Sequence, residues 1–205
     1  ADSGAITIHG QVAVGPALAD PSTAVEQVGQ VTITGQPPIV SQPQPLTLPA
    51  VEPSAACAAG AGDMKLHKGE ILTLFESGSP YCFKKLEVKD RASIVVQGHV
   101  VVYAGEVKVQ QDARVNAAGR PTQLIIQVTS DRKVKLQDDV IVVGGIYAPQ
   151  SKAKVKDDVV LYGSLIASRI KVKHGAAIHY DKALMTVGPA VGAGDALLRA
   201  WRDLN

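Results

Sequence analysis

Residues 132–149, RKVKLQDDVIVVGGIYAP, are followed at 151–168 by SKAKVKDDVVLYGSLIAS, which repeats them at an offset of 19 residues. A weaker third copy, RIKVKHGAAIHY, begins at Arg169. Repeats of this length, rich in Val and Ile and punctuated by Gly and Asp, are typical of a solenoid whose repeats bury their apolar faces against one another. The identical pairs are Lys133/Lys152, Lys135/Lys154, Asp138/Asp157, Asp139/Asp158, Val140/Val159, Gly144/Gly163 and Ala148/Ala167.

The same rhythm extends upstream to residue 85, with steps of 21, 27, 19 and 17 residues between successive passes. The long step contains a loop-like stretch, 116–121, which indicates one coil with an insertion. Steps near 18–20 residues suit three short strands per coil and predict an all-β, right-handed parallel β-helix. A leucine-rich repeat would need a fixed Leu and Asn frame, and an α/β fold would need helices between the strands. The passes open at Leu86, Val107, Val134, Ala153 and Ile170.

We expect a single β-helical domain over residues 1–205. Residues 1–35 alternate apolar and polar residues and are expected to form the first coils. Residues 36–56 hold six prolines and are expected to be a surface strap, with a linker as the alternative. Residues 57–184 are expected to form the main β-helix. The tail, 185–205, carries a predicted capping helix at Ala196–Leu204, with Trp201 covering the last coil.

Composition excludes some classes of partner. The chain has 21 basic and 19 acidic residues, a net charge of +2, which predicts no electrostatic attraction to nucleic acid or to an anionic membrane. Because Lys133, Lys135, Asp138 and Asp139 fall within one repeat, we expect an evenly charged, solvated face. No apolar run reaches 18 residues, so no membrane span is expected. The chain starts at Ala1 without Met, and we expect a processed piece with a signal or membrane anchor upstream.

Two cysteines, Cys57 and Cys82, allow two interpretations. In an exported protein they would pair and close a loop of about 25 residues, which is worth roughly 3 kcal/mol in the chain-entropy model. In a cytosolic protein they would be buried thiols.

The ionisable residues suggest structural roles more strongly than chemical ones. The spacing of the histidines matches no zinc pattern, and we expect His179 and Asp181 to make turn or end-of-helix hydrogen bonds. Stacking of Asp138 and Asp139 on Asp157 and Asp158 in the next coil would allow a calcium site. Short acidic side chains also satisfy turn backbones, and that interpretation is favoured, so no cofactor is expected.

A ligand surface could come from aromatic side chains. Tyr147, Tyr162 and Tyr180 lie 15 and 18 residues apart, and their alignment would form a carbohydrate platform, with core or turn packing as the alternative. The chain has no nucleophile elbow, P-loop or dinucleotide fingerprint. A polysaccharide lyase or hydrolase would need clustered carboxylates with an Arg or Lys base on one face.

Three segments carry a family resemblance: Gly145–Lys152 (GIYAPQSK), Leu161–Ala167 (LYGSLIA) and Ile178–Leu184 (IHYDKAL). They resemble the C-terminal β-helical domain of PilX-like pilus-assembly-associated proteins, and the rhythm alone is more distantly similar to the polymerising bactofilins. The resemblance implies a bacterial envelope or surface protein and singles out the positions His179, Tyr180 and Asp181. It carries over no catalytic residues.

The leading hypothesis is a non-enzymatic structural or adhesive domain at the bacterial cell surface or in the periplasm. Its expected partners are envelope or pilus proteins, or surface glycans, and not nucleic acid. Two alternatives stay open. One is a β-helical carbohydrate-binding or carbohydrate-active protein, and the other is a self-associating scaffold of the bactofilin kind.

Overall fold

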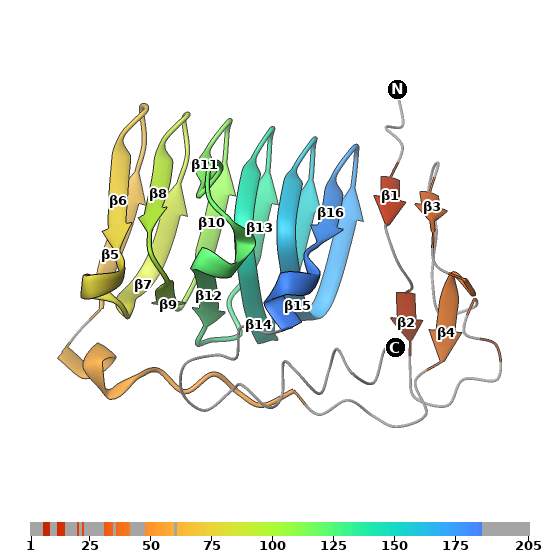
Figure 1. Cartoon of the computed structure of the whole chain (residues 1–205), viewed down its shortest axis with the longest axis horizontal. Coiled ribbons are helices and arrows are strands. Elements are labelled where there is room, and N and C mark those ends of the chain that lie inside the picture. The colour runs from red at the N-terminus through yellow and green to blue at the C-terminus, as the bar shows by residue number, and fades with distance from the viewer. Residues whose placement is uncertain are drawn as a thin grey trace.

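The computed structural model is a parallel β-solenoid of about six coils, and it confirms the predicted β-helix (Figure 1). It describes residues 6–8, 12–14, 20, 22, 31–34, 36–41, 48–59 and 61–185. The coils advance from β5 and β6 at one end to β15 and β16 at the other. The strands of the solenoid are β5 (Gly62–Leu66), β6 (Ile71–Phe75), β7 (Tyr81–Val88), β8 (Ser93–Gln97), β9 (Val100–Ala104), β10 (Val107–Gln110), β11 (Arg114–Val115), β12 (Leu124–Val128), β13 (Val134–Gln137), β14 (Ile141–Lys156), β15 (Val160–Lys173) and β16 (Ala177–Tyr180).

Three ladders of parallel strands form three walls around the core. Wall 1 contains residues 62–66, 85–88, 107–110, 134–137, 152–156 and 169–173. Wall 2 contains residues 71–75, 93–97, 114–115, 141–143, 160–163 and 177–180. Wall 3 contains residues 81–83, 100–104, 124–128, 145–148 and 164–167. The long strands β14 and β15 pass from one wall to the next, so the walls form one continuous sheet system.

The core consists of aliphatic side chains that stack from coil to coil. On wall 1, Leu86, Val107 and Val134 are in register, and each is at most 1% exposed. Val140 and Val159 are buried as well, and their coils are adjacent because Val160 N donates to Val140 O at 2.8 Å. Burial of each such side chain stabilises the fold by about 1.5–3 kcal/mol. The repeat therefore stacks its apolar positions as the sequence predicts.

Each coil passes from wall 1 to wall 2 through a turn of two residues with positive φ. Asp138–Asp139 and Asp157–Asp158 are two such turns, with φ between 57° and 66°. Asp tolerates this conformation better than most residues because its short side chain bonds locally. The second residue of each turn donates its N–H to the carbonyl of the first residue in the next coil, as Asp139 does to Asp157 at 2.9 Å. The other turns are Lys68–Gly69, Asp90–Arg91, Gln111–Asp112 and His174–Gly175.

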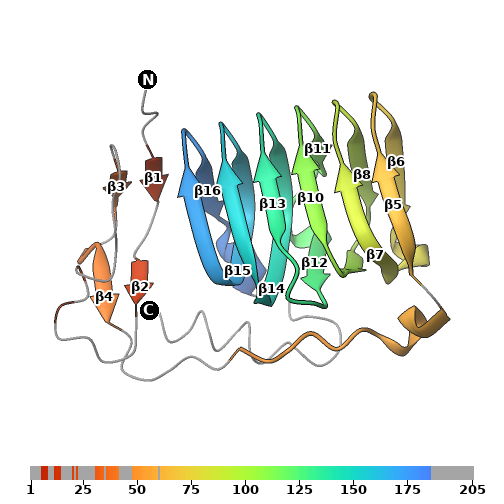
Figure 2. The ribbon, with the colours of Figure 1, turned by 180° about the vertical axis from the view of Figure 1, so that it is seen from behind.

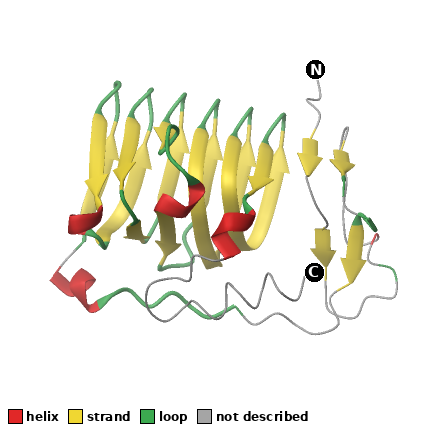
Figure 3. Ribbon diagram, viewed as in Figure 1, coloured by secondary structure: helices red, strands yellow, loops and turns green. Residues whose placement is uncertain are grey.

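Short 3-10 helices lie outside the walls (Figure 3). Three of them interrupt the path from wall 2 to wall 3, and one lies in the strap. Within the described part of the chain, no helix is long and apolar enough to cross a membrane. The predicted helix Ala196–Leu204, with Trp201, lies outside the described residues. The short helices are η2 (Ala55–Ala59), η3 (Glu76–Gly78), η4 (Pro121–Gln123) and η5 (Lys182–Met185).

The N-terminal strands stack on the last coil, not before the first. β1 (Ile6–Ile8) pairs in parallel with β16, and β3 (Val31–Ile33) pairs with β1 (Figure 2). A separate pair is formed by β2 (Val12–Val14) and β4 (Ile39–Ser41). This placement differs from the expectation that residues 1–35 form the first coils.

The strap explains that placement. Its described part, residues 48–59, runs outside the coils back to β5, against the direction in which the coils advance. Seven extended residues and a five-residue 3-10 helix span about 30 Å, while six coils need only about 24 Å between the first and the last strand. The strap is therefore long enough to connect opposite ends of the stack.

Candidate functional site

The strap is fastened to wall 3 by a disulfide between Cys57 and Cys82. Of the two interpretations that the sequence left open for the cysteines, the structure has the bonded pair. Val51 of the strap is buried against Tyr103 and Tyr147 of wall 3. This small apolar cluster lies outside the main core, and with the disulfide it makes the strap an integral part of the fold.

Tyr147, a candidate for an aromatic platform, serves this attachment. It is 2% exposed, and its hydroxyl donates a hydrogen bond to Pro49 O at 2.7 Å. Burial raises the pKa of the Tyr147 phenol to about 12. Because the ring is covered by the strap, Tyr147 is not a ligand surface in this structure.

Tyr162 has the opposite environment. It is 44% exposed on wall 2, where it is in register with His179 of the next coil. The two rings stack with their centroids 4.9 Å apart and their planes inclined by 16°. Adjacent parallel strands lie about 4.8 Å apart, so the register itself produces the stacking.

The stacked rings line an open pocket of about 420 Å³. Tyr180, Asp181 and Lys182 line it as well, so the pocket brings together four of the candidate residues, Tyr162, His179, Tyr180 and Asp181. Burial raises the pKa of the Tyr180 phenol, and the neighbouring Asp181 carboxylate adds to that shift. Tyr147 is the candidate residue that the fold places elsewhere.

Asp181 also ends the last coil. Its N–H donates to Gly163 O at 3.2 Å, and its Oδ1 accepts the N–H of Ala183 in the first turn of η5 at 2.8 Å. Leu184, at the end of this turn, is buried. The Asp181 carboxylate therefore holds η5 beside the pocket, in addition to lining it.

The opposite rim of the pocket comes from the insertion that the 27-residue step predicts. Ala117, Gly119 and Pro121 of this insertion line the pocket. Asn116, which is 3% exposed, donates from Nδ2 to Val143 O at 3.1 Å and to Arg120 O at 3.2 Å. This side chain anchors the insertion over wall 2. Sequence reasoning did not single out Asn116, although its position at the start of the loop signal was a clue.

The chemistry available in the pocket is an aromatic face with charged groups beside it. A flat ring pair suits contact with the apolar face of a ring-shaped ligand, while the Asp181 carboxylate and the Lys182 ammonium can orient polar groups. Among the residues that the structure describes, no three His, Cys, Asp or Glu side chains converge in a way that could hold a metal ion.

The stacked aspartates that suggested calcium contact basic groups instead. Asp157 pairs with Lys156 and lies 2.9 Å from His174 Nδ1, and Asp138 Oδ1 lies 3.9 Å from Lys156 Nζ. The hydrogen bond from Lys156, assisted by His174, lowers the pKa of the Asp157 carboxyl. Asp139 and Asp158, the second residues of these turns, are exposed. The four aspartates thus form the turns, and two of them make ion pairs.

One comparison with known proteins places this arrangement in a family. Residues 84–187, just over half of the chain, match the family model of a domain of unknown function, DUF7305. The chain belongs to the DUF7305 family. The DUF7305 segment contains most of the coils and the whole pocket, while the strap precedes it. Searches of curated proteins and of solved structures each found no match. The resemblance to PilX-like proteins stays a prediction.

Proposed function

We propose that this chain is a non-enzymatic structural or adhesive domain of the bacterial envelope or cell surface, working outside the cytoplasm. The observation that carries the proposal is the bond between Cys57 and Cys82. Structural disulfides persist in oxidising compartments and are rare in the cytosol, where thiols are kept reduced. The expected envelope and pilus partners follow from the family resemblance of residues 145–184.

The architecture supports a structural role. A stack of coils with a continuous aliphatic core and a backbone ladder along its turns is a stiff, elongated body. The strap stiffens it further, because it attaches at Cys82 near one end and at Tyr147 several coils away. Such a body can present its outer walls to partners without rearrangement.

The proposal is tested on the protein in its native cells. Free thiols are blocked with a maleimide–polyethylene glycol reagent before and after reduction, in envelope and cytosolic fractions. We expect the protein in the envelope or outside the cell, unlabelled before reduction and doubly labelled after it. A Cys57→Ser variant, with one thiol left, should be labelled once without reduction and shows that the reagent has access. Two free thiols on protein found only in the cytosol would overturn the proposal.

A second candidate function, glycan binding, is favoured by the exposed Tyr162 ring stacked on His179. Binding of envelope glycans would be measured by calorimetry with the wild type and with Tyr162→Ala. If the ring pair is the platform, the substitution weakens binding about tenfold or more. Phe75→Ala is the matched control, because Phe75 is also exposed (47%) on wall 2 but lies in the first coil. Equal losses in both variants would refute a site at Tyr162.

A further inference from the structure

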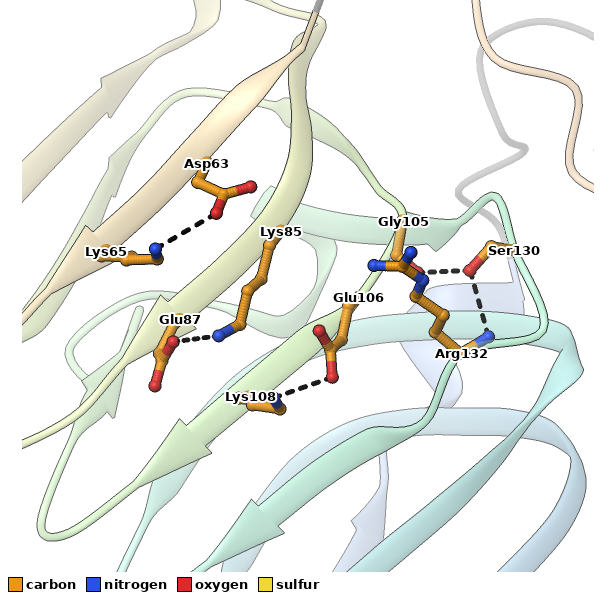
Figure 4. A network of polar contacts seen from close by, with 9 residues as sticks. All are labelled: Asp63, Lys65, Lys85, Glu87, Gly105, Glu106, Lys108, Ser130 and Arg132. Atoms are coloured by element: carbon orange, nitrogen blue, oxygen red, sulfur yellow. Dashed lines mark hydrogen bonds and ion pairs between the residues drawn. The ribbon is translucent and has the colours of Figure 1, made fainter.

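The outward face of wall 1 has two halves of different charge. In the first three coils, acidic and basic side chains alternate and pair (Figure 4). Lys65 lies 3.2 Å from Asp63, Lys108 lies 2.9 Å from Glu106, and Lys85 pairs with Glu87. The hydrogen bond from Lys85 lowers the pKa of the Glu87 carboxyl. Each strand in this half therefore neutralises its own charge.

The other half of wall 1 is cationic. Its central column consists of Lys135, Lys154 and Lys171, which are in direct register on β13, β14 and β15. A second column lies two residues earlier on each strand and contains Lys133, Lys152 and Arg169. We call these six residues the lysine patch. Five of them are exposed and Lys135 is partly buried, and no carboxylate of the described residues lies within 4.0 Å of any of them.

Two more lysines extend the patch toward the turns. Lys173 is exposed and in register with Lys156, which makes the ion pairs to Asp138 and Asp157. Residues 132–173 carry nine Lys and Arg against four Asp, and all four Asp lie in the turns. The evenly charged face expected from the sequence is therefore wrong for this half of the wall, because the fold places the basic residues on the strands and the acidic ones at the corner.

The spacing makes the lysine patch a dense array of charge. Neighbouring columns are separated by two residues, about 6.6 Å, and neighbouring strands by about 4.8 Å. Like charges directly opposite each other on paired strands destabilise a sheet. The first half of the same wall avoids this cost with acidic residues at equivalent positions, such as Glu87 in the column of Lys65 and Lys108. The second half keeps the repulsion, which a polyanionic partner would relieve.

We propose that the lysine patch docks the solenoid on an anionic lipid surface. The array extends in two dimensions on a sheet wall, which matches a plane of headgroups better than a linear polymer. Its residues are almost all Lys, and no aromatic residue occurs on the wall 1 strands to stack on bases or sugars. Both pockets found among the described residues lie elsewhere, one beside the disulfide and one beside Tyr162. Clusters of four to eight basic residues near a membrane are typical of binding to anionic lipids.

Purified full-length protein is tested by sedimentation with phosphatidylcholine vesicles, with and without phosphatidylglycerol, at about 0.1 M salt. We expect binding only when phosphatidylglycerol is present. Replacement of the central column by Lys135→Glu, Lys154→Glu and Lys171→Glu should weaken partitioning by at least about 100-fold. Lys→Gln at the same three positions is a second variant, should the Glu version fail to fold.

The matched control makes the same change of net charge outside the patch. It combines Lys68→Glu, Lys84→Glu and Arg91→Glu, three exposed positions in the first two coils. The control should bind vesicles nearly as well as the wild type. Equal binding to neutral vesicles, or equal weakening by the control, would overturn the proposal.

Two further probes separate the membrane from other polyanions. Duplex DNA and polygalacturonate are offered in solution to the same variants. Tighter binding of either polymer than of the anionic vesicles, lost with the central column, would replace the membrane by that polymer. These measurements need only purified protein, so their failure leaves the proposed extracytoplasmic function standing, and a cytosolic location would leave vesicle binding intact.

Discussion

Gly163 occupies a position in the stack that only glycine can fill. It has φ of +143° and is in register with Gly144 of the preceding coil, its counterpart in the repeat. A Cβ built on Gly163 would lie 2.0 Å from Gly144 O and 2.7 Å from Gly144 C. Both are backbone atoms held by the parallel ladder, so neither can move aside without breaking the register. We therefore predict that Gly163→Ala strongly destabilises the solenoid.

The magnitude follows from two contributions. A non-glycine residue held in a sparsely populated backbone region costs about 1–3 kcal/mol. An extra methyl group forced into a packed position costs about 1–3 kcal/mol more. A total near 4 kcal/mol should lower the melting temperature by about 8–16 °C in a chain of this size.

The assay is thermal unfolding followed by far-ultraviolet circular dichroism, with Gly62→Ala as the matched control. A Cβ at Gly62 meets nothing within 4 Å, so the same glycine-to-alanine change should leave the melting temperature almost unaltered. A Gly163→Ala protein that melts within about 2 °C of the wild type would refute the close approach of the two coils.

Three other predictions concern the strap and the turns. Replacing Cys57 and Cys82 by Ser should lower the free energy of unfolding in urea by about 3.5 kcal/mol, because the bond joins residues 25 apart in sequence; an unchanged unfolding midpoint would contradict the fastening of the strap. The raised pKa of Tyr147, about 12, means that its stabilising contribution is complete below pH 10 and is lost as pH rises toward 12, at about 2–3 kcal/mol; the alkaline loss should be smaller in Tyr147→Phe, and absorbance at 295 nm should show one tyrosine fewer ionising late. The lowered pKa of Asp157 means that its contribution is present above pH 4 and is lost as pH falls below it. Asp157→Asn keeps a residue that tolerates positive φ and should flatten the acid limb of the stability curve by under about 1 kcal/mol; an acid limb identical to that of the wild type would show that the Lys156 contact contributes nothing.

Part of the candidate site could be read from the sequence and part could not. His179, Tyr180 and Asp181 are adjacent in sequence, and Tyr162 lies one coil earlier, so the repeat length alone brings them together. Tyr147 has nearly the same spacing but is covered by the strap. Which tyrosine is exposed depends on where the strap runs, and no periodicity in the coils specifies that.

The repeat by itself determined the solenoid, its coil length, its aliphatic core and the turns at the paired aspartates. These follow from local rules, because each coil packs only on its neighbours and a fixed spacing puts equivalent side chains in columns. The tertiary structure alone decided three features: the attachment of the strap, the stacking of β1 on β16, and the separation of charge on wall 1. They bring together segments far apart in the chain or sum contributions over several coils. A net charge of +2 therefore says nothing of a wall on which six cations stand together.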